Sequence, residues 1–587
     1  MRTFLLSAAG AFAALFAFNL LAFLFLLGTL GATLGSGGSE PEQSDSLVLT
    51  MDLRTPLSDL APTSGLAAFS REQGFVDILT KLEAAADDPT VNGLFLRASQ
   101  AGIGSARAEE LRSAIIKLRD AGKFVIAHTQ DSYSTGPSGY RAIAAADELW
   151  IQPGSTLLAT GVTFETLFLG QLFDDLSIVP EIEAFYEYKN APNTFTETDY
   201  TAPHREAMTA LAESVWNVSL DSISSDRRID REELKSLLES GPISSGEAVA
   251  SGLMDRIGWP EDAQTEAISK NDDNSLLPIS QYNPPFVGAR AQQIAIVGGE
   301  GAIVTGVSDA GGFGSGNTFA SDTVAQSILQ AGRNSRVKAI VFRVDSPGGS
   351  PDASDQIWRS VERVQEMGKP VVISMGSAAA SGGYYVSAGA DYIFANPSTI
   401  TGSIGIFGGK QTISGAMERI GIFPRTISVG GEFADAYGTD PFTEEQREQV
   451  ITYLKRGYDR FTSIVAEGRG LSEDQIDDVA RGRVWSGADA LEVGLVDELG
   501  GFTDAIEKAK ELADIATEED VRLVFYPARK TGFEALEELF GASTEVARAA
   551  SVIGTLAGDE RLDDALTQMQ LLQNERSQAL GPILREH

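Results

Sequence analysis

The stretch from Val371 to Phe407, VVISMGSAAASGGYYVSAGADYIFANPSTITGSIGIF, decides the fold. It predicts a buried strand at Val371–Met375, a small-residue turn, a helix from about Ala379 and a second strand at Tyr392–Ala395. Ser381 lies where the first strand meets the helix, and two glycines follow it. A helix N-terminus offers unpaired N–H groups and the positive end of the dipole. A serine there can attack a carbonyl while these amides receive the oxyanion, although the same residues also suit a tightly packed helix start.

The composition restricts the chemistry. A chain of 587 residues is too long for one core, so we expect two or more domains with appendages. The formal net charge of -36 argues against nucleic acid as a partner. There is no cysteine, and the three histidines are His128, His204 and His587, so we expect neither a metal nor another cofactor. A nucleophilic Ser381 would more readily take a lysine than a histidine as its base.

The N-terminal segment predicts a membrane anchor. Residues 3–39 carry no charge, and Phe4–Leu27 is almost wholly apolar. A helix of that length spans a hydrocarbon core of about 30 Å. Arg2 precedes the run and acidic residues follow it, so the N-terminus is expected in the cytoplasm and the bulk of the chain outside. The run is long for a signal peptide and lacks a clean A-x-A site, so we favour an uncleaved anchor.

The rest of the chain repeats itself. Strands alternate with amphipathic helices from Leu47 onward, a pattern typical of a parallel α/β layer structure. A second unit starts near Gln293, and three segment pairs align: residues 88–99 with 334–346, 122–130 with 368–376, and 139–153 with 383–397. A period of about 245 residues is too long for a solenoid and indicates a tandem duplication. We predict an anchor and tether at 1–46, repeats at 47–285 and 286–525, and a helical tail at 526–587.

The two repeats differ where chemistry is expected. Pro137 stands opposite Ser381 and has neither a hydroxyl nor an N–H, with Ser138 next to it. The glycine-rich DSPGGS at Asp345–Ser350 has ASQAGIGS as its counterpart, and its spacing would let the amides of Gly348 and Gly349 face Ser381. Taken alone, DSPGGS is also a plain turn after a strand. These differences assign the candidate nucleophile to the second repeat.

A lysine in the first repeat complements this serine. A strand is expected at Ile182–Tyr188, and Lys189 stands at its end, 28 positions after Gly161. The same count from Gly402 reaches Gly430, so the repeat with the serine lacks the lysine. A general base must be neutral near pH 7, whereas glutamates on the same strand face would raise the pKa of Lys189. An ordinary solvated strand-end cation is therefore the competing interpretation.

Three segments carry a resemblance to a known family: SAAASGGYYVSAGADYIFANPSTITGSIGIF, the preceding VFRVDSPGGS and the following SGADALEVGLVDELGG. The chain resembles the membrane-bound signal peptide peptidase family, in its long two-repeat form, over about Leu47–Val524 plus the anchor. The resemblance implies a Clp-protease/crotonase-like ββα-spiral fold, duplicated, behind a transmembrane helix. It implies Ser381 as nucleophile and Lys189 as general base. Ser403 in TGSIG would hold the lysine amine, and amides of Gly382 and of Gly348 or Gly349 would bind the oxyanion.

The same resemblance implies an activity and a setting. The protein would be a serine endopeptidase of the bacterial inner membrane with its bulk in the periplasm. It would degrade remnant signal peptides and other short apolar peptides, and it would assemble into a homo-oligomer, a tetramer in the long form. Two alternatives stay open: a non-catalytic membrane scaffold and, from the superfamily that the resemblance implies, an acyl-CoA-processing enzyme of the crotonase type. The negative charge and the tail are not explained by the resemblance.

Overall fold

The computed structural model describes residues 46–55, 57–61, 73–98, 103–130, 136–271, 275–288, 290–307, 319–517 and 519–528. The predicted anchor Phe4–Leu27 and residues 529–587 of the predicted tail lie outside these ranges. Within them, no helix combines the length and the apolar character that a membrane crossing needs. Tyr526 closes a strand, so regular sheet structure reaches one residue into the segment predicted as tail.

The first repeat is built on a parallel sheet in the order β8-β4-β3-β2-β1-β9. Its strands are nearly continuous apolar runs, as expected for a parallel sheet that is covered on both faces. The strands are β1 (Leu47–Asp52), β2 (Val91–Ala98), β3 (Phe124–Thr129), β4 (Glu148–Ile151), β8 (Arg256–Ile257) and β9 (Leu276–Pro278).

The second repeat forms a sheet in the order β18-β16-β14-β13-β10-β20, with β15 pairing β14 and β19 pairing β15. All of its neighbours are parallel except β16 and β18. The strands are β10 (Gln293–Glu300), β13 (Val337–Ser346), β14 (Val371–Ala380), β15 (Tyr392–Ala395), β16 (Ile400–Gly402), β18 (Val484–Ser486), β19 (Glu498–Leu499) and β20 (Arg522–Tyr526). The predicted duplication of a parallel α/β unit is therefore confirmed.

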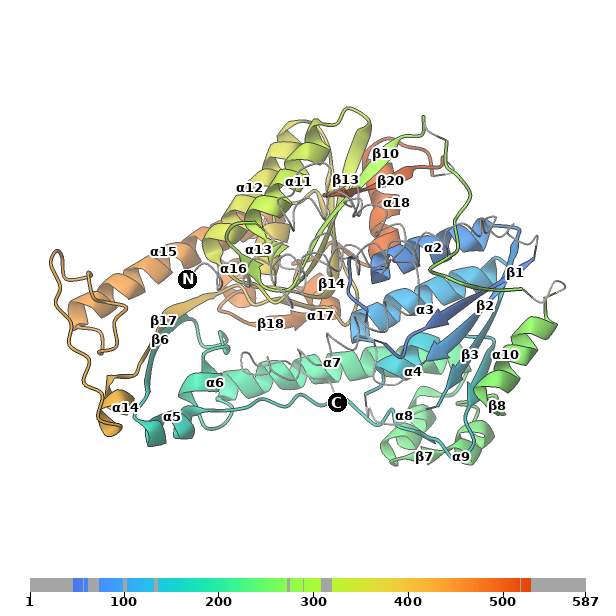
Figure 1. The fold of residues 1–587 in the computed structure, drawn as a ribbon, viewed down its shortest axis with the longest axis horizontal. Coiled ribbons are helices and arrows are strands. Elements are labelled where there is room, and N and C mark those ends of the chain that lie inside the picture. Colours follow the sequence, from blue (N-terminus) through green and yellow to red (C-terminus); the bar gives the residue numbers. More distant parts are fainter. Residues whose placement is uncertain are drawn as a thin grey trace, which may run out of the picture.

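Helices separate the two sheets and cover their outer faces (Figure 1). Between the sheets lie α2 (Phe75–Asp87) and α3 (Ser105–Asp120) of the first repeat and α18 (Phe502–Leu512) of the second, and they share one apolar core. The outer face of the second sheet is covered by α11 (Ser321–Arg333) and α12 (Pro351–Glu366). The outer face of the first is covered by α10 (Pro260–Ser269). Because one core serves both repeats, each repeat is buried against the other.

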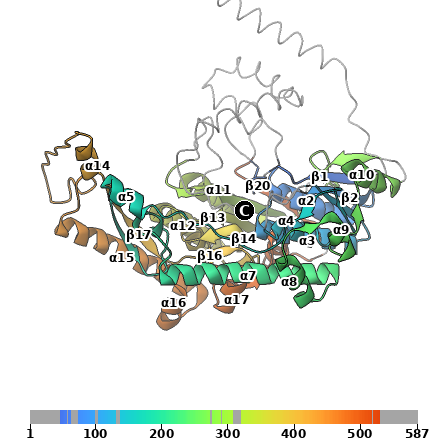
Figure 2. The same ribbon diagram turned by 90° about the horizontal axis from the view of Figure 1, so that it is seen from below.

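An arm and a long helix extend beyond the two sheets. In the arm, β6 (Val179–Phe185) of the first repeat pairs antiparallel with β17 (Ile406–Thr412) of the second. Beside them lie α5 (Gly170–Leu176) and α14 (Ser414–Arg419), at the left of Figure 1. The long helix α7 (Ala202–Arg227) runs from the arm past β18 toward the first sheet, and Figure 2 shows it along one side of the molecule.

The remaining elements complete the two repeats. The helices are α4 (Ser138–Ile143), α6 (Asn193–Thr196), α8 (Arg231–Glu239), α9 (Ser245–Ala250), α13 (Gly382–Ser387), α15 (Glu444–Arg469), α16 (Glu473–Val479) and α17 (Gly487–Glu492). The short strands are β5 (Thr156–Leu157), β7 (Ile243–Ser244), β11 (Ile303–Val304) and β12 (Phe319–Ala320).

Several predicted boundaries are wrong. The strand expected at Val371–Met375 continues to Ala380, where a turn was expected, and the strand expected from Ile182 begins at Val179. The helix expected from about Ala379 begins at Gly382, because residues 378–380 continue β14 and pair with β16. The strand expected at Ile182–Tyr188 ends at Phe185, because its partner β17 begins at Ile406, which pairs with Phe185. In both cases a strand from elsewhere in the chain sets the boundary. The strand at Tyr392–Ala395 is confirmed.

Candidate active site

Ser381 forms a sharp turn between β14 and α13. Its backbone has φ 53° and ψ -114°, a conformation that non-glycine residues seldom adopt and that concentrates at functional sites. The turn is held from both sides, since the Ser381 N–H donates to the Gly402 carbonyl at 2.8 Å and the Tyr385 N–H donates to the Ser381 carbonyl at 2.9 Å. The strand and the helix therefore fix the direction of the half-buried Ser381 side chain.

The arm brings Lys189 of the first repeat to this turn. After β6 leaves its partner, the Tyr186 and Tyr188 amides both donate to the Arg481 carbonyl, at 3.3 and 3.2 Å. The Lys189 backbone lies so close to Gly482 that a Cβ there would be 2.4 Å from the Lys189 nitrogen. The second repeat thus holds the segment on which Lys189 stands, although the two segments are far apart in the chain.

The Lys189 amine makes three short contacts. Its Nζ donates to Ser381 Oγ at 3.0 Å and to both the carbonyl and the Oγ of Ser403 at 2.9 Å. Ser403 itself has a positive φ of 50°, and its N–H donates to the Arg483 carbonyl at 2.6 Å. The family resemblance implied the Ser403 hydroxyl here but not its carbonyl, because turn conformation decides where a carbonyl points.

Burial is the dominant electrostatic effect on Lys189. The residue is 5 % exposed, and desolvation lowers the pKa of its amine to about 7. The glutamates that would have raised this pKa are paired elsewhere, Glu183 with Arg447 at 2.6 Å and Glu187 with Arg481 at 2.9 Å. A substantial fraction of the Lys189 amine is therefore neutral at pH 7, as a general base requires.

The glycine loop after β13 lies against Ser381. A Cβ on Gly348, whose φ is 110°, would lie 2.8 Å from Ser381 Cβ and 2.9 Å from the Gly382 nitrogen. The Gly348 N–H donates to Ser346 Oγ at 3.1 Å. Among the residues that the structure describes, the N–H groups of Gly349 and Gly382 have no acceptor. A Cβ on Gly382 would be 3.1 Å from the Gly349 nitrogen, so these two free amides are neighbours.

The corresponding place in the first repeat has no such arrangement. Pro137 precedes α4 where Ser381 precedes α13. The neighbouring Ser138 is buried, and its Oγ lies 2.7 Å from Ser105 Oγ, so it is not displaced into the position of a nucleophile. All the residues that the sequence analysis proposed for the site lie together at the junction of the two repeats.

The counterpart of Lys189 in the second repeat follows from two matching turns. Ser177 after α5 and Gly421 after α14 both have left-handed backbones, with φ of 58° and 82°, and each begins an S/G-I-x-P sequence. In this register Phe433 stands opposite Lys189, rather than the Gly430 reached by simple counting. Neither residue carries an amine, so the second repeat lacks the lysine in either alignment.

Comparison with known proteins shows the family of this chain. The family model "Peptidase family S49" matches residues 117–272 and 363–516, one segment in each repeat and together more than half of the chain. The chain belongs to peptidase family S49. This S49 chain is 34% identical to Protease 4 of Haemophilus influenzae over 75% of its own length and 73% of that protein. It is 32% identical to Protease 4 of Salmonella typhi, covering 84% of this chain and 82% of that one.

A plant relative extends the family. The S49 chain is 30% identical to the chloroplastic serine protease SPPA of Arabidopsis thaliana, over 81% of this chain and 71% of the relative. A solved ClpP1 mutant of Listeria monocytogenes has 16% sequence identity and a TM-score of 0.23 over 36% of the chain and 94% of that structure, a likeness too slight to carry weight. The S49 chain is a serine protease of the long two-repeat signal peptide peptidase form.

Proposed function

We propose that this peptidase hydrolyses peptide bonds with a Ser381–Lys189 dyad, completed by Ser403 and by the amides of Gly349 and Gly382. The observation that carries the proposal is the 3.0 Å contact between Lys189 Nζ and Ser381 Oγ, made by an amine whose pKa burial lowers to about 7. Lysine and serine at this distance form a known variant of the nucleophile–base arrangement. The two predicted repeats, at 47–285 and 286–525, would each contribute one member of the dyad.

The mechanism follows from these contacts. Neutral Lys189 takes the proton of Ser381 Oγ while the oxygen bonds to the peptide carbonyl carbon, and the carbonyl oxygen becomes an oxyanion. The free amides of Gly349 and Gly382 stabilise this charge. The resulting ammonium then protonates the leaving amine as the C–N bond breaks. Water, deprotonated by the same lysine, attacks the acyl-enzyme and releases Ser381.

Among the three predicted glycines, Gly348 takes a different part in this proposal. Its amide already donates to Ser346 Oγ, so it has no N–H to spare for the oxyanion. Its lack of a side chain matters instead, because any Cβ would lie 2.8 Å from Ser381 Cβ. Ser403 supplies a hydroxyl and a carbonyl to the lysine amine and orients it toward Ser381.

We propose short apolar peptides, including remnant signal peptides, as the substrates. A relative from Enterococcus faecium, 34% identical over 34% of the chain, is named a putative signal peptide peptidase. The apolar N-terminal run at Phe4–Leu27 supports an anchor that keeps the enzyme at the bacterial inner membrane, with the catalytic bulk in the periplasm. Such a location would bring the site to peptides that leave the bilayer.

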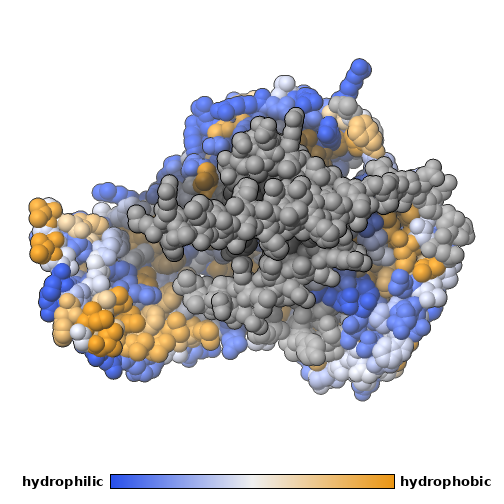
Figure 3. Space-filling view, in the orientation of Figure 1, coloured by the Kyte–Doolittle hydropathy of each residue, from blue (hydrophilic) through white to orange (hydrophobic). Residues whose placement is uncertain are grey.

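We further propose a head-to-tail homo-oligomer. The two matching turns make residues 423–429 the counterpart of β6 and residues 162–168 the counterpart of β17. Both segments are described, yet neither pairs with another described strand. Their apolar side chains are open to solvent: Leu167 is 65% exposed, Ile427 94% and Val429 95%. Figure 3 shows apolar surface at the end of the molecule where Figure 1 places the arm.

These unpaired segments fit a second copy of this chain. Residues 423–429 of one copy would pair with 162–168 of the next, which repeats between chains the β6·β17 contact already made within one chain. A head-to-tail contact closes into a ring if its rotation allows. The resemblance to the long form makes four copies our expectation. At each junction between chains, the second repeat's segment without a lysine would meet the first repeat's Pro137. Such a junction would have neither the lysine nor the serine, so the active sites would form within chains.

The proposal is tested by hydrolysis of a short apolar peptide by the full chain in detergent. We expect Ser381→Ala and Lys189→Ala each to lower kcat by about three orders of magnitude or more, with circular dichroism showing that each variant is folded. The matched control is Lys455→Ala, whose exposed amine pairs with Asp459 at 2.6 Å on α15 and should leave the rate unchanged. Full activity of folded Lys189→Ala would mean that the base is elsewhere.

A further inference from the structure

The strand that leads to Ser381 carries a bulge. Val344 pairs with Met375 and Ser346 pairs with Ala379, so the single residue Asp345 faces three residues of β14. In the first repeat, β2 and β3 pair without a shift from Gly93–Phe124 to Ala98–Thr129. Bulges next to active sites re-aim side chains. The bulge is thus a feature of the repeat that contains the serine.

The Asp345 carboxylate fills this bulge. Its Oδ1 accepts the Ala378 N–H at 3.0 Å, three residues before Ser381. A Cβ on Gly376 would lie 2.8 Å from Asp345 Cγ, so the carboxylate lies directly against the β14 backbone. Asp345 also precedes Ser346, whose Oγ holds the Gly348 amide. One carboxylate therefore joins the glycine loop to the strand that delivers Ser381.

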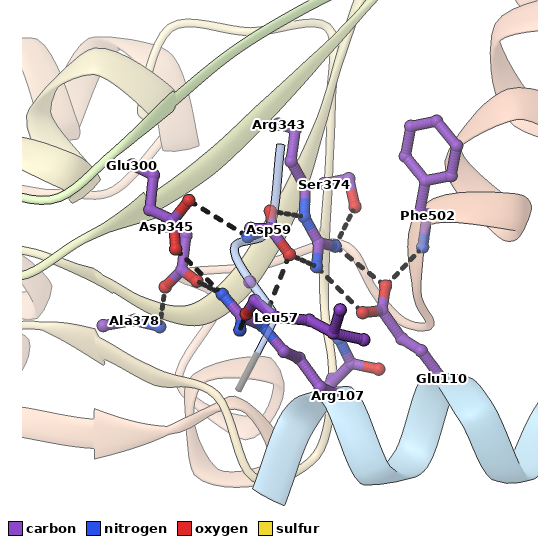
Figure 4. A network of polar contacts seen from close by, with 12 residues as sticks. Leu57, Asp59, Arg107, Glu110, Glu300, Arg343, Asp345, Ser374, Ala378 and Phe502 are labelled. Atoms are coloured by element: carbon purple, nitrogen blue, oxygen red, sulfur yellow. Dashed lines mark hydrogen bonds and ion pairs between the residues drawn. The ribbon is translucent and has the colours of Figure 1, made fainter. Parts of the chain in front are cut away.

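A cation from the other repeat holds this carboxylate. Arg107 on α3 donates through Nη2 to Asp345 Oδ2 at 3.0 Å and to Glu300 Oε1 at 3.1 Å, and through Nη1 to the Leu57 carbonyl at 2.5 Å (Figure 4). Its side chain is only 16% exposed. Burial raises the pKa of Asp345, and the nearby Arg107 opposes that rise. Arg107 thereby helps to keep Asp345 charged.

A second buried arginine fastens the neighbouring part of β14. Arg343 makes hydrogen bonds of 2.7 to 2.9 Å to Asp59 and Glu110 of the first repeat. It also donates to Ser374 Oγ at 2.9 Å. Around Asp345 the charged groups are therefore Arg107, Arg343, Asp59 and Glu300 (Figure 4). Of these, Arg107 is the one that contacts the Asp345 carboxylate by a hydrogen bond.

We propose that Arg107 is a positioning residue for the peptidase site: by holding Asp345 in the β14 bulge, it sets the spacing between the glycine loop and Ser381. This inference rests on the proposed function, and it gives the first repeat a part in the site beyond Lys189. Without the guanidinium, the carboxylates of Asp345 and Glu300 lose the cation that they share and repel each other. The carboxylate then turns away, Ala378 loses its acceptor, and the Gly349 amide shifts relative to Ser381.

The test compares Arg107→Met, Arg107→Lys and Arg112→Met in the full chain. Arg112 is the matched control, because it stands on the same helix and is fixed by Asp226, at 2.6 Å through both Nε and Nη2, within the first repeat. For Arg107→Met we expect kcat to fall about 10- to 100-fold and KM to change less than about 3-fold, since oxyanion contacts act in the transition state. Arg107→Lys should recover part of kcat, and Arg112→Met should match the wild type.

The path through Asp345 is tested by a double-mutant cycle. Asp345→Asn preserves shape, and it should lower kcat about as much as Arg107→Met. The kcat of the double variant should lie within about 3-fold of the kcat of either single variant, because both substitutions remove the same link. Should Arg107→Met fail to fold, Asp345→Asn carries the test alone. The inference would be overturned by a kcat of folded Asp345→Asn within about 3-fold of the wild type. It would also be overturned if the losses of kcat in the two single variants multiplied in the double variant.

Hydrogen exchange separates this inference from the proposed function. Peptides that contain Ala378 should exchange faster in Arg107→Met than in Arg112→Met, whether or not the chain cleaves any peptide. Equal exchange of these peptides in the two variants would exclude the positioning role of Arg107 and would leave the proposed dyad unaffected. Conversely, faster exchange in a chain where Ser381→Ala retains full peptidase activity would refute the dyad and leave the Arg107–Asp345 link intact.

Discussion

Lys189 Nζ lies 3.0 Å from Ser381 Oγ, although the two residues are 192 positions apart and belong to different repeats. The contact depends on the antiparallel pairing of β6 with β17, which draws the end of the first repeat's arm across the second. The serine stands in the second repeat and the lysine in the first. The proposed dyad therefore needs both repeats.

Activity should depend on pH through the lysine amine. Because Lys189 acts as a base only when neutral, and burial lowers its pKa to about 7, kcat should rise from acid pH and level off above about pH 8. The check is kcat for an apolar peptide from pH 5 to 9, with circular dichroism at each pH to show that the chain stays folded. A midpoint near 4 to 5 would point to a carboxylate base, and one near 10 to a solvated lysine.

Replacing the lysine should stabilise the fold at neutral pH. The Lys189 pKa is lower in the folded chain, so the unfolded chain binds more protons between about pH 7 and 10.5, and wild-type stability rises with pH there. Lys189→Met removes this penalty. Its gain in unfolding free energy is at most about 4 to 5 kcal/mol near pH 7 and shrinks by about 1.4 kcal/mol per pH unit above it.

Denaturant unfolding at pH 7, 8.5 and 10 measures this gain. Lys455→Met serves as the reference, since its amine is exposed on α15 and should show no comparable trend. A Lys189→Met gain that stays constant with pH would contradict a lowered pKa, because the penalty arises only from the difference in protonation between the folded and unfolded chains.

Ser403→Ala should weaken the enzyme without inactivating it. The substitution removes one hydrogen bond to Lys189 Nζ, while the backbone carbonyl of residue 403 keeps another at 2.9 Å. One such bond is worth about 1 to 1.5 kcal/mol, so kcat should fall about 5- to 15-fold. Ser214→Ala is a suitable control, since it also removes a hydroxyl contact, at 2.7 Å to Ser486 Oγ. Equal rates for the wild type and Ser403→Ala would exclude a role in orienting the lysine.

The proposed head-to-tail contact predicts a change of mass. Ile427→Asp combined with Val429→Asp puts two charges on the segment that would pair with the next copy, so the oligomer should dissociate. Native mass spectrometry of the full chain in detergent measures this. Phe286→Asp, at a residue 82% exposed and outside both pairing segments, should leave the mass unchanged. An unaltered oligomer in the double variant would place the interface elsewhere.

Much of the fold could be predicted from the sequence, but the ends of several strands could not. The strand at Tyr392–Ala395 and the duplication follow from apolar runs, turn residues and repeated segments, which are local properties. The strand before Ser381 was predicted to end at Met375, yet it continues to Ala380 because β16 pairs with its end. Likewise, β6 ends at Phe185 because β17, its partner from the other repeat, begins opposite that residue.

The candidate site divides in the same way. Neighbouring residues determine the position of Ser381 between a strand and a glycine-rich helix start, so the sequence alone was enough to predict it. The pKa of Lys189, the acceptor at the Ser403 carbonyl and the choice of Gly349 over Gly348 as a free amide are decided by the tertiary structure. Desolvation, and which donors find acceptors, depend on groups that only folding brings together.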